Sequence, residues 1–167
     1  AYEISTRDWS SDVCSSDLAD GHFFRDDTWQ LEPTSDTGEF AALGGLFSSC
    51  RDLARWVGVM AAAFPARNDH DRETPLSRAS LREMQQGMRK VPIGISASTG
   101  DEPFTISNAM YGFGLVVTDD PRIGVTVGHS GGYPGFGTHM SWHPESGIGV
   151  VALTNGRYGG AFRVATA

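Results

Sequence analysis

The feature that most constrains the fold is a series of strand-like segments joined by turns that are too short to cross a sheet. Alternating apolar residues mark these segments at residues 111–118, 122–127, 136–142 and 148–155. Turns rich in Asp, Pro, Gly and Ser lie at residues 119–121 and 143–147. Because parallel neighbours need a crossover of a dozen or more residues, we expect an antiparallel sheet.

Two helices are predicted before these strands. The first begins at Ser48, Ser49 and Asp52 and runs to Pro65, and the second begins at Ser77 and ends near Pro92. Their apolar faces consist of Leu53, Trp56, Val57, Met60 and Phe64, and of Leu81, Met84 and Met88. We also expect a hairpin over residues 21–31 and a surface loop over residues 94–103. Helices followed by an antiparallel meander predict an α+β fold, with helices packed on the sheet.

The composition permits a packed core and excludes two classes of partner. Hydrophobic residues make up 40% of the 167 residues and charged residues 20%, which is not the balance of a disordered chain. The net charge of -7, with Lys90 as the single lysine, argues against nucleic acid, because phosphate binding needs clustered Lys and Arg. No apolar run is long enough to span a membrane.

Residues 8–18 have an unusual sequence, D-W-S-S-D-V-C-S-S-D-L. A polar loop of Ser and Asp turns is one interpretation. However, these eleven residues match the translation of a widely used sequencing adapter, so we interpret residues 1–18 as a non-native segment and exclude them from fold reasoning. Cys50 is then the single native cysteine, and no intrachain disulfide is expected.

The candidate site is the motif G-H-S-G-G-Y-P-G-F-G at residues 128–137, directly after a strand-like run. An imidazole and a hydroxyl at a strand end, followed by glycines, allow a ligand to approach closely. In one interpretation Ser130 is the nucleophile of an α/β-hydrolase elbow, G-x-S-x-G. Glycines and Pro134 follow the serine in place of the helix that an elbow needs, and no Asp follows it, which disfavours this interpretation.

Three stretches in a fixed order resemble the β-lactamase-related serine hydrolases, which include class C β-lactamases, D-alanyl-D-alanine carboxypeptidases and esterases. They are G-G-L-F-S-S-C-R-D-L-A-R-W at residues 44–56, Y-G-F-G-L at 111–115, and the motif at 128–137 followed by S-W-H-P-E-S-G-I-G-V-V-A-L-T-N at 141–155. The resemblance implies a helix-covered sheet with an acyl-enzyme mechanism at its edge. The substrate it implies is a small-molecule ester or amide or a peptide.

The resemblance also implies roles for five residues of the motif. His129 takes the place of the lysine in the family's K-T-G box, where it would hold the substrate and tune the pKa of the nucleophile's base. Ser130 would donate a hydrogen bond to substrate, and Gly131 would keep the strand edge open. The backbone N–H of Gly132 would supply half of the oxyanion hole, and Tyr133 would shape the rim.

Two boxes of this family are missing from the chain. No serine lies three residues before Lys90, so no S-x-x-K nucleophile box exists, and none of the four tyrosines has an Asn two residues later. We therefore expect residues 19–167 to be the C-terminal part of a hydrolase domain that is inactive alone. A non-catalytic binding module of the same fold is the alternative. The localisation is left open because the native N-terminus would lie outside this sequence.

No cofactor or metal is predicted. His129, His139 and His143 have side chains that suit metal binding, but no Cys or carboxylate cluster accompanies them. His139 and His143 are expected to be surface and loop histidines. Cys50 has no partner histidine placed to suggest a cysteine hydrolase.

Overall fold

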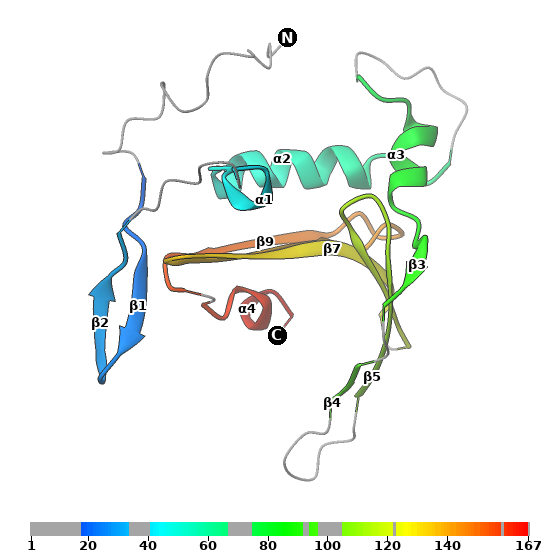
Figure 1. The fold of residues 1–167 in the computed structure, drawn as a ribbon. Coiled ribbons are helices and arrows are strands. Elements are labelled where there is room, and N and C mark those ends of the chain that lie inside the picture. Colours follow the sequence, from blue (N-terminus) through cyan, green and yellow to red (C-terminus); the bar gives the residue numbers. More distant parts are fainter. Residues whose placement is uncertain are drawn as a thin grey trace.

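The described chain begins with a hairpin that stands beside the main sheet (Figure 1). β1 (His22–Arg25) pairs antiparallel with β2 (Thr28–Leu31) through a turn at Asp26 and Asp27, whose φ angles are 51° and 58°. Left-handed backbone at both turn residues matches the twist of the flanking strands. The predicted hairpin is confirmed. The structure is a computed structural model that describes residues 18–33, 41–66, 75–91, 94–96, 105–121, 123–157 and 159–166.

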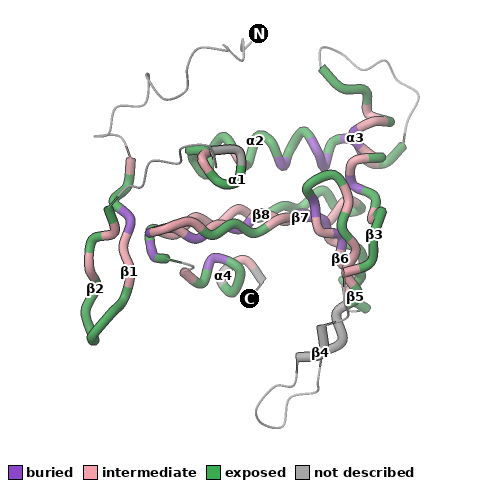
Figure 2. Tube along the Cα trace, viewed as in Figure 1, coloured by how far each residue is buried: buried purple, intermediate pink, exposed green. Residues whose placement is uncertain are grey.

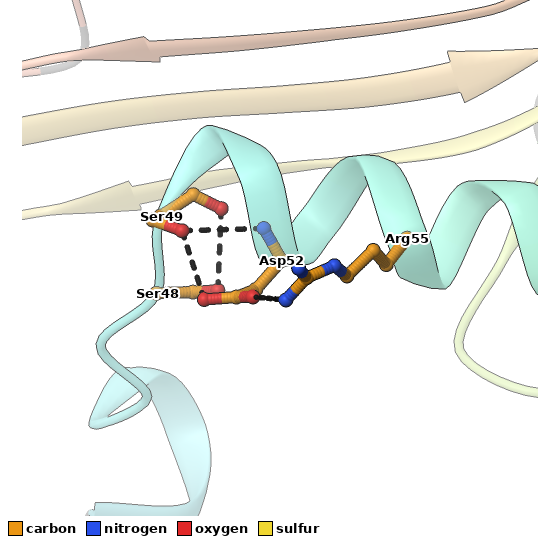
Figure 3. Close-up of polar contacts among 4 residues, drawn as sticks. All are labelled: Ser48, Ser49, Asp52 and Arg55. Atoms are coloured by element: carbon orange, nitrogen blue, oxygen red, sulfur yellow. Dashed lines mark hydrogen bonds and ion pairs between the residues drawn. The ribbon is translucent and has the colours of Figure 1, made fainter. Parts of the chain in front are cut away.

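The first predicted helix begins where its capping residues indicate. A single turn, α1 (Ala41–Gly44), precedes α2 (Cys50–Ala61), and Ser49 is the N-cap of α2. The Ser49 hydroxyl accepts a hydrogen bond from the backbone N–H of Asp52 at 3.2 Å and donates to the Asp52 carboxylate at 2.9 Å (Figure 3). Arg55 pairs with the same carboxylate. The bond from Asp52 satisfies one of the N–H groups that the first helical turn leaves free, and the other two bonds hold the Asp52 carboxylate in place.

The second helix is shorter than the sequence predicts. α3 (Arg78–Met84) starts after Ser77, whose hydroxyl accepts from the backbone N–H of Ser80, but it ends well before Pro92. A Cβ on Gly87 would lie 2.3 Å from the Cβ of Met110, so the chain passes there in direct contact with the sheet. The following residues then pair with the sheet as β3 (Arg89–Lys90) and do not continue the helix.

The main sheet is antiparallel throughout. Its order is β3-β5-β6-β7-β8-β9, and β4 pairs with β5. The further strands are β4 (Gly94–Ser96), β5 (Thr105–Tyr111), β6 (Val116–Asp120), β7 (Gly124–Tyr133), β8 (Phe136–Trp142) and β9 (Gly149–Thr154). The predictions for the last two strands agree with the structure closely.

Two strand predictions need correction. The single strand predicted over residues 111–118 is the end of β5, a turn, and the start of β6. A Cβ on Gly112 would lie 2.3 Å from the Gln86 carbonyl oxygen, and Gly114 has a φ of 71°, so the two glycines make the turn. The loop predicted over residues 94–103 includes β4, while the rest of that loop lies outside the described residues.

Helices cover both faces of the sheet. α2 and α3 lie on one side, which we call the α2 face, and α4 (Ala161–Thr166) lies on the other, the α4 face (Figure 1). The buried residues of α2, Val57, Met60 and Ala61, lie on the side of the helix that faces the sheet (Figure 2). The core cluster consists of Val57, Met60, Ala61, Ala63, Leu81, Leu115, Val117, Val127 and Trp142. The chain therefore has the predicted α+β architecture.

A polar link crosses this core. The Gln85 side chain, which is 5% exposed, donates to the carbonyl oxygens of Met60 and Leu81, each at 2.9 Å. Its carbonyl oxygen accepts from the indole N–H of Trp142 at 2.7 Å. Every polar atom of the amide thus has a partner, which is the condition for burying it without a large cost. No helix in the described part of the chain is long and apolar enough to cross a membrane.

Candidate functional site

The motif at residues 128–137 forms the second half of β7 and the turn into β8. Pairing of β7 with β6 ends where Val116 lies opposite Gly128, whereas pairing with β8 continues to Tyr133 opposite Phe136. The expectation that the strand ends at Val127 is therefore wrong, because the β8 partner extends it through the glycines. Among the described residues, no strand pairs with the other side of residues 129–133. We call this segment the open edge.

The direction of the backbone groups at the open edge follows from the ladder. His143 N–H bonds to the Ile148 carbonyl at 2.8 Å, which makes this a hydrogen-bonded pair of β8 and β9. Bonded and non-bonded pairs alternate along antiparallel strands, so Trp142 and Met140 bond to β7, and His139 bonds to β9. Ser130 and Gly132 of β7 therefore direct their N–H and C=O groups away from β8. Both residues are exposed, so these groups are available to a ligand.

The nucleophile elbow is excluded by this geometry. An elbow requires a sharp turn from strand to helix at the serine. Ser130 instead lies within β7, which ends three residues later in a two-residue turn where Gly135 has a φ of 80°. The backbone of Gly135 is so close to Gly21 that a Cβ on either residue would lie under 3.0 Å from the other. The backbone of this turn therefore packs directly against the segment that precedes β1.

His129 and Ser130 point to opposite faces of the sheet, because successive side chains of a strand alternate. His129 lies opposite Met140, which packs against the core on the α2 face. Ser130 lies opposite His139, whose ring packs against Phe162 of α4 at a centroid distance of 5.1 Å. The motif therefore brings two polar side chains together along the chain but presents them on different sides.

Tyr111, at the end of β5, contacts His129. Its hydroxyl lies 3.2 Å from His129 Nε2, and the two rings meet edge to face with their centroids 6.0 Å apart. No role was predicted for Tyr111 from the sequence, although it is the first residue of the Y-G-F-G-L stretch. β6 begins at Val116, which lies opposite Tyr111 on one side and Gly128 on the other, so no residue of β6 pairs with His129 and Tyr111 lies near the open edge.

His139 is buried, which corrects its assignment as a surface histidine. Its side chain is 7% exposed, and its Nδ1 lies 2.7 Å from the Ser130 hydroxyl oxygen. Burial lowers the pKa of His139, and the nearby His129 imidazole lowers it further. No described group hydrogen-bonds its Nε2. His143 does lie in the turn where it was predicted, bonded to Ser146.

The remaining motif residues shape the α2 face of the open edge. A Cβ on Gly44 of α1 would lie 3.1 Å from the Tyr133 ring, so α1 and this tyrosine are in close contact. A Cβ on Gly131 would lie 2.6 Å from the Thr138 hydroxyl oxygen. The glycine therefore keeps the surface flat between His129 and Tyr133, which share its face.

The described residues contain no cluster of His, Cys, Asp and Glu that could hold a metal ion. Cys50 is exposed at the first residue of α2, and its thiol is not part of the open edge. The open edge offers hydrogen bonding by its backbone N–H groups, the His129 imidazole and the Tyr111 phenol.

Comparison with known proteins gives one positive finding. The family model described as Beta-lactamase matches residues 10–167. A search of curated proteins and a search of solved structures find no match.

Proposed function

Because the chain belongs to the β-lactamase family of serine hydrolases, we propose that its open edge binds the acyl group of an ester or amide substrate. The substrate would be a β-lactam, a D-alanyl-D-alanine peptide or a carboxylic ester. One observation carries the proposal: β7 continues beyond its pairing with β6 and exposes its backbone at residues 129–133.

The outward N–H of Gly132 supports a role in the oxyanion hole. A donor that is fixed before the reaction stabilises the charge that develops on the substrate carbonyl oxygen. β8 pairs with β7 from Val127 to Tyr133, so the N–H direction of Gly132 is set by the ladder. The same holds for Ser130, whose backbone groups face the same side.

His129 would contact the carbonyl or carboxylate end of the substrate. The Tyr111 hydroxyl at 3.2 Å holds the imidazole at the edge, and both residues are accessible from solvent. An imidazole can donate to an anionic group or accept a proton, depending on its protonation state. Ser130 would contribute through its backbone, since its hydroxyl lies on the α4 face.

The 167-residue chain would not turn over substrate by itself. The family mechanism needs a serine activated by a lysine three residues later, and this sequence has no S-x-x-K. Removal of the nucleophile and its base leaves only the weak stabilisation that the oxyanion hole and substrate binding provide. The open edge would then retain binding without catalysis.

A binding titration with the purified chain tests the edge directly. Penicillin G and an acetylated D-alanyl-D-alanine dipeptide are added to the 15N-labelled protein, and amide shifts are followed by NMR. We expect the amides of Ser130 and Gly132 to shift, and His129→Ala to weaken binding about tenfold, equivalent to one charge-assisted hydrogen bond. His143→Ala is the matched control, because His143 lies in the turn between β8 and β9. Equal weakening by the two variants, or shifts outside the open edge, would contradict the proposal.

An activity assay tests the proposal that the chain does not turn over substrate by itself. Nitrocefin and p-nitrophenyl butyrate should show no turnover with the purified chain. Sustained turnover that His129→Ala abolishes would mean that the chain is active as it stands.

Re-sequencing of the source locus then separates enzyme from binding module: a reading frame that joins residue 19 to S-x-x-K and Y-x-N boxes supports an enzyme, and a gene that starts near residue 19 supports a binding module.

A further inference from the structure

The α4 face of the sheet carries a serine and a histidine in the geometry of a nucleophile and its base. Ser130 on β7 and His139 on β8 lie directly opposite each other, and Ser130 Oγ is 2.7 Å from His139 Nδ1. This pair is separated from His129 by the sheet itself. The binding proposed for the open edge uses neither of these two side chains.

The tautomer of His139 decides whether the hydroxyl or the ring nitrogen donates in this bond. The pKa of His139 is lowered by its burial, so the imidazole is neutral near pH 7 and one ring nitrogen has a free lone pair. In the tautomer that carries its proton on Nε2, the hydroxyl of Ser130 donates to Nδ1 of His139, and this is the arrangement in which His139 can act as a base.

A reactive serine needs an exposed hydroxyl and a buried, fixed base, and Ser130 and His139 differ in exposure in this way. Ser130 is exposed, and the glycines at 131 and 132 leave it without bulky neighbours along the strand. His139 is 7% exposed, and its ring is held between its strand partners and Phe162. The nucleophile is open to a reagent, while the base is fixed in place.

We propose that Ser130 is a selectively reactive serine that accepts a phosphonyl group from a small fluorophosphonate, with His139 as its base. With a fluorophosphonate, a bond forms between Oγ and phosphorus, and the phosphorus–fluorine bond breaks to release fluoride. The hydroxyl proton passes to Nδ1 of His139 and then to water. No described carboxylate contacts Nε2 to stabilise the imidazolium, so the reaction is a single modification and not a catalytic cycle.

A second serine and histidine in the chain provide a matched control. Ser146 Oγ lies 2.9 Å from Nδ1 of His143, a similar distance. However, that Nδ1 already accepts the backbone N–H of Ser146 at 3.1 Å, and the hydroxyl oxygen accepts from the N–H of Ile148. The lone pair that would take the serine proton is shared, so Ser146 should stay unreactive.

The test is labelling of the 167-residue chain with a biotin-tagged ethyl fluorophosphonate, with sites mapped and rates measured by mass spectrometry. We expect label on Ser130 and none on Ser146. His139→Gln should slow labelling of Ser130 by about 100-fold, the lower range for loss of a general base, while His143→Gln leaves the rate unchanged. Absence of label on Ser130, or equal rates with and without His139, would overturn the proposal.

A measurement on the unmodified chain tests the role of His139 without a variant that could fail to fold. The 15N chemical shift of His139 Nδ1 should be that of an unprotonated nitrogen at pH 7, because the serine donates to it. A protonated Nδ1 would overturn the assignment of His139 as base. Neither result depends on ligand binding at the open edge, so the two proposals fail separately.

Discussion

The two halves of β7 differ in how they are held, although they belong to one strand. Residues 124–128 pair with β6, Val127 and Gly128 among them also pair with β8, and Val127 is 1% exposed. Residues 129–133 pair with β8 alone, and three of the five are exposed. The first half, which we call the paired half, fixes the strand in the core. The second half, the open half, carries the open edge and extends the strand into solvent with its direction already set.

This difference explains how an exposed edge can hold a defined geometry. A strand with one free side is ordinarily a risk for unwanted pairing, and glycine weakens it further. Here the paired half anchors one end, and the turn at Gly135 is fastened to Gly21 at the other. The backbone N–H groups of residues 129–133 are therefore held in position from both ends of the segment.

The largest effect is expected from a methyl group added in the paired half. A Cβ on Gly128 would lie 2.3 Å from the Met140 carbonyl oxygen and 2.9 Å from Ser141 Cα, and backbone atoms cannot move aside. We expect Gly128→Ala to lower the free energy of unfolding by more than about 3 kcal/mol, measured by urea denaturation.

Gly131→Ala, the same change in the open half, should lower the free energy of unfolding by a smaller amount. A Cβ on Gly131 would meet only the end of the Thr138 side chain, which can rotate, so we expect a loss of about 1 kcal/mol. Gly58→Ala is the control: nothing lies within 4 Å of that site on α2, and alanine should stabilise the helix by about 0.5–1 kcal/mol. Equal losses at Gly128 and Gly131 would remove the distinction between the two halves.

A second effect concerns the polar link beneath the paired half. Gln85→Met preserves most of the volume but leaves the Trp142 indole N–H and the Met60 carbonyl oxygen buried without this partner. Unsatisfied buried groups are destabilising, so we expect a loss of about 2 kcal/mol in urea denaturation. Because Trp142 lies opposite Val127, amide exchange should increase in the paired half first. Uniform exchange along β7 would mean that the two halves open together.

The parts of this architecture that were predictable from sequence have local causes. The caps at Ser49 and Ser77 are set by side chains within three residues of the bonds they make. The segment at 136–142 has the alternation of a half-buried strand, and the structure places β8 at the same residues. The fold class follows from the short turns, because they leave antiparallel pairing as the one possibility.

The parts that were mispredicted depend on contacts between distant segments. The glycines after Gly128 resemble a loop when read alone, and pairing with β8 is what makes them a strand. The break at Gly112 results from the Gln86 carbonyl oxygen, which is far away in sequence. His139 is buried because α4 covers its face of the sheet, and no pattern near His139 indicates that helix. Of the site, the sequence identified the strand that carries it but not the partners Tyr111 and His139.

A third, smaller effect is a pH dependence of stability from the buried histidine opposite the open half. Burial lowers the pKa of His139 below its ordinary value of 6.5. Well above pH 6.5 the residue is neutral in both states and contributes no pH dependence. As the pH falls below 6.5, the unfolded chain binds the proton first, so the free energy of unfolding decreases until the pH passes below the folded pKa.

Urea denaturation at a series of pH values measures this contribution. The slope from one group cannot exceed about 1.4 kcal/mol per pH unit. His139→Gln should reduce the decrease in stability below pH 6.5, and His143→Gln, a change in an exposed turn, should leave it as in the parent chain. An unchanged decrease in the His139 variant would place the cause in other groups.

The smallest effect on stability is expected at the open half itself. Tyr111→Phe removes the hydroxyl that lies 3.2 Å from His129 Nε2, but the ring stays and the bond is exposed to solvent. Water replaces the lost partner, so the free energy of unfolding should change by less than about 0.5 kcal/mol. The imidazole, no longer held, should sample several rotamers, which three-bond couplings of the His129 side chain detect by NMR. Weaker binding of the D-alanyl-D-alanine dipeptide with unchanged stability would show that the open half serves recognition. A loss of stability as large as that of Gln85→Met would instead make the Tyr111 contact part of the fold.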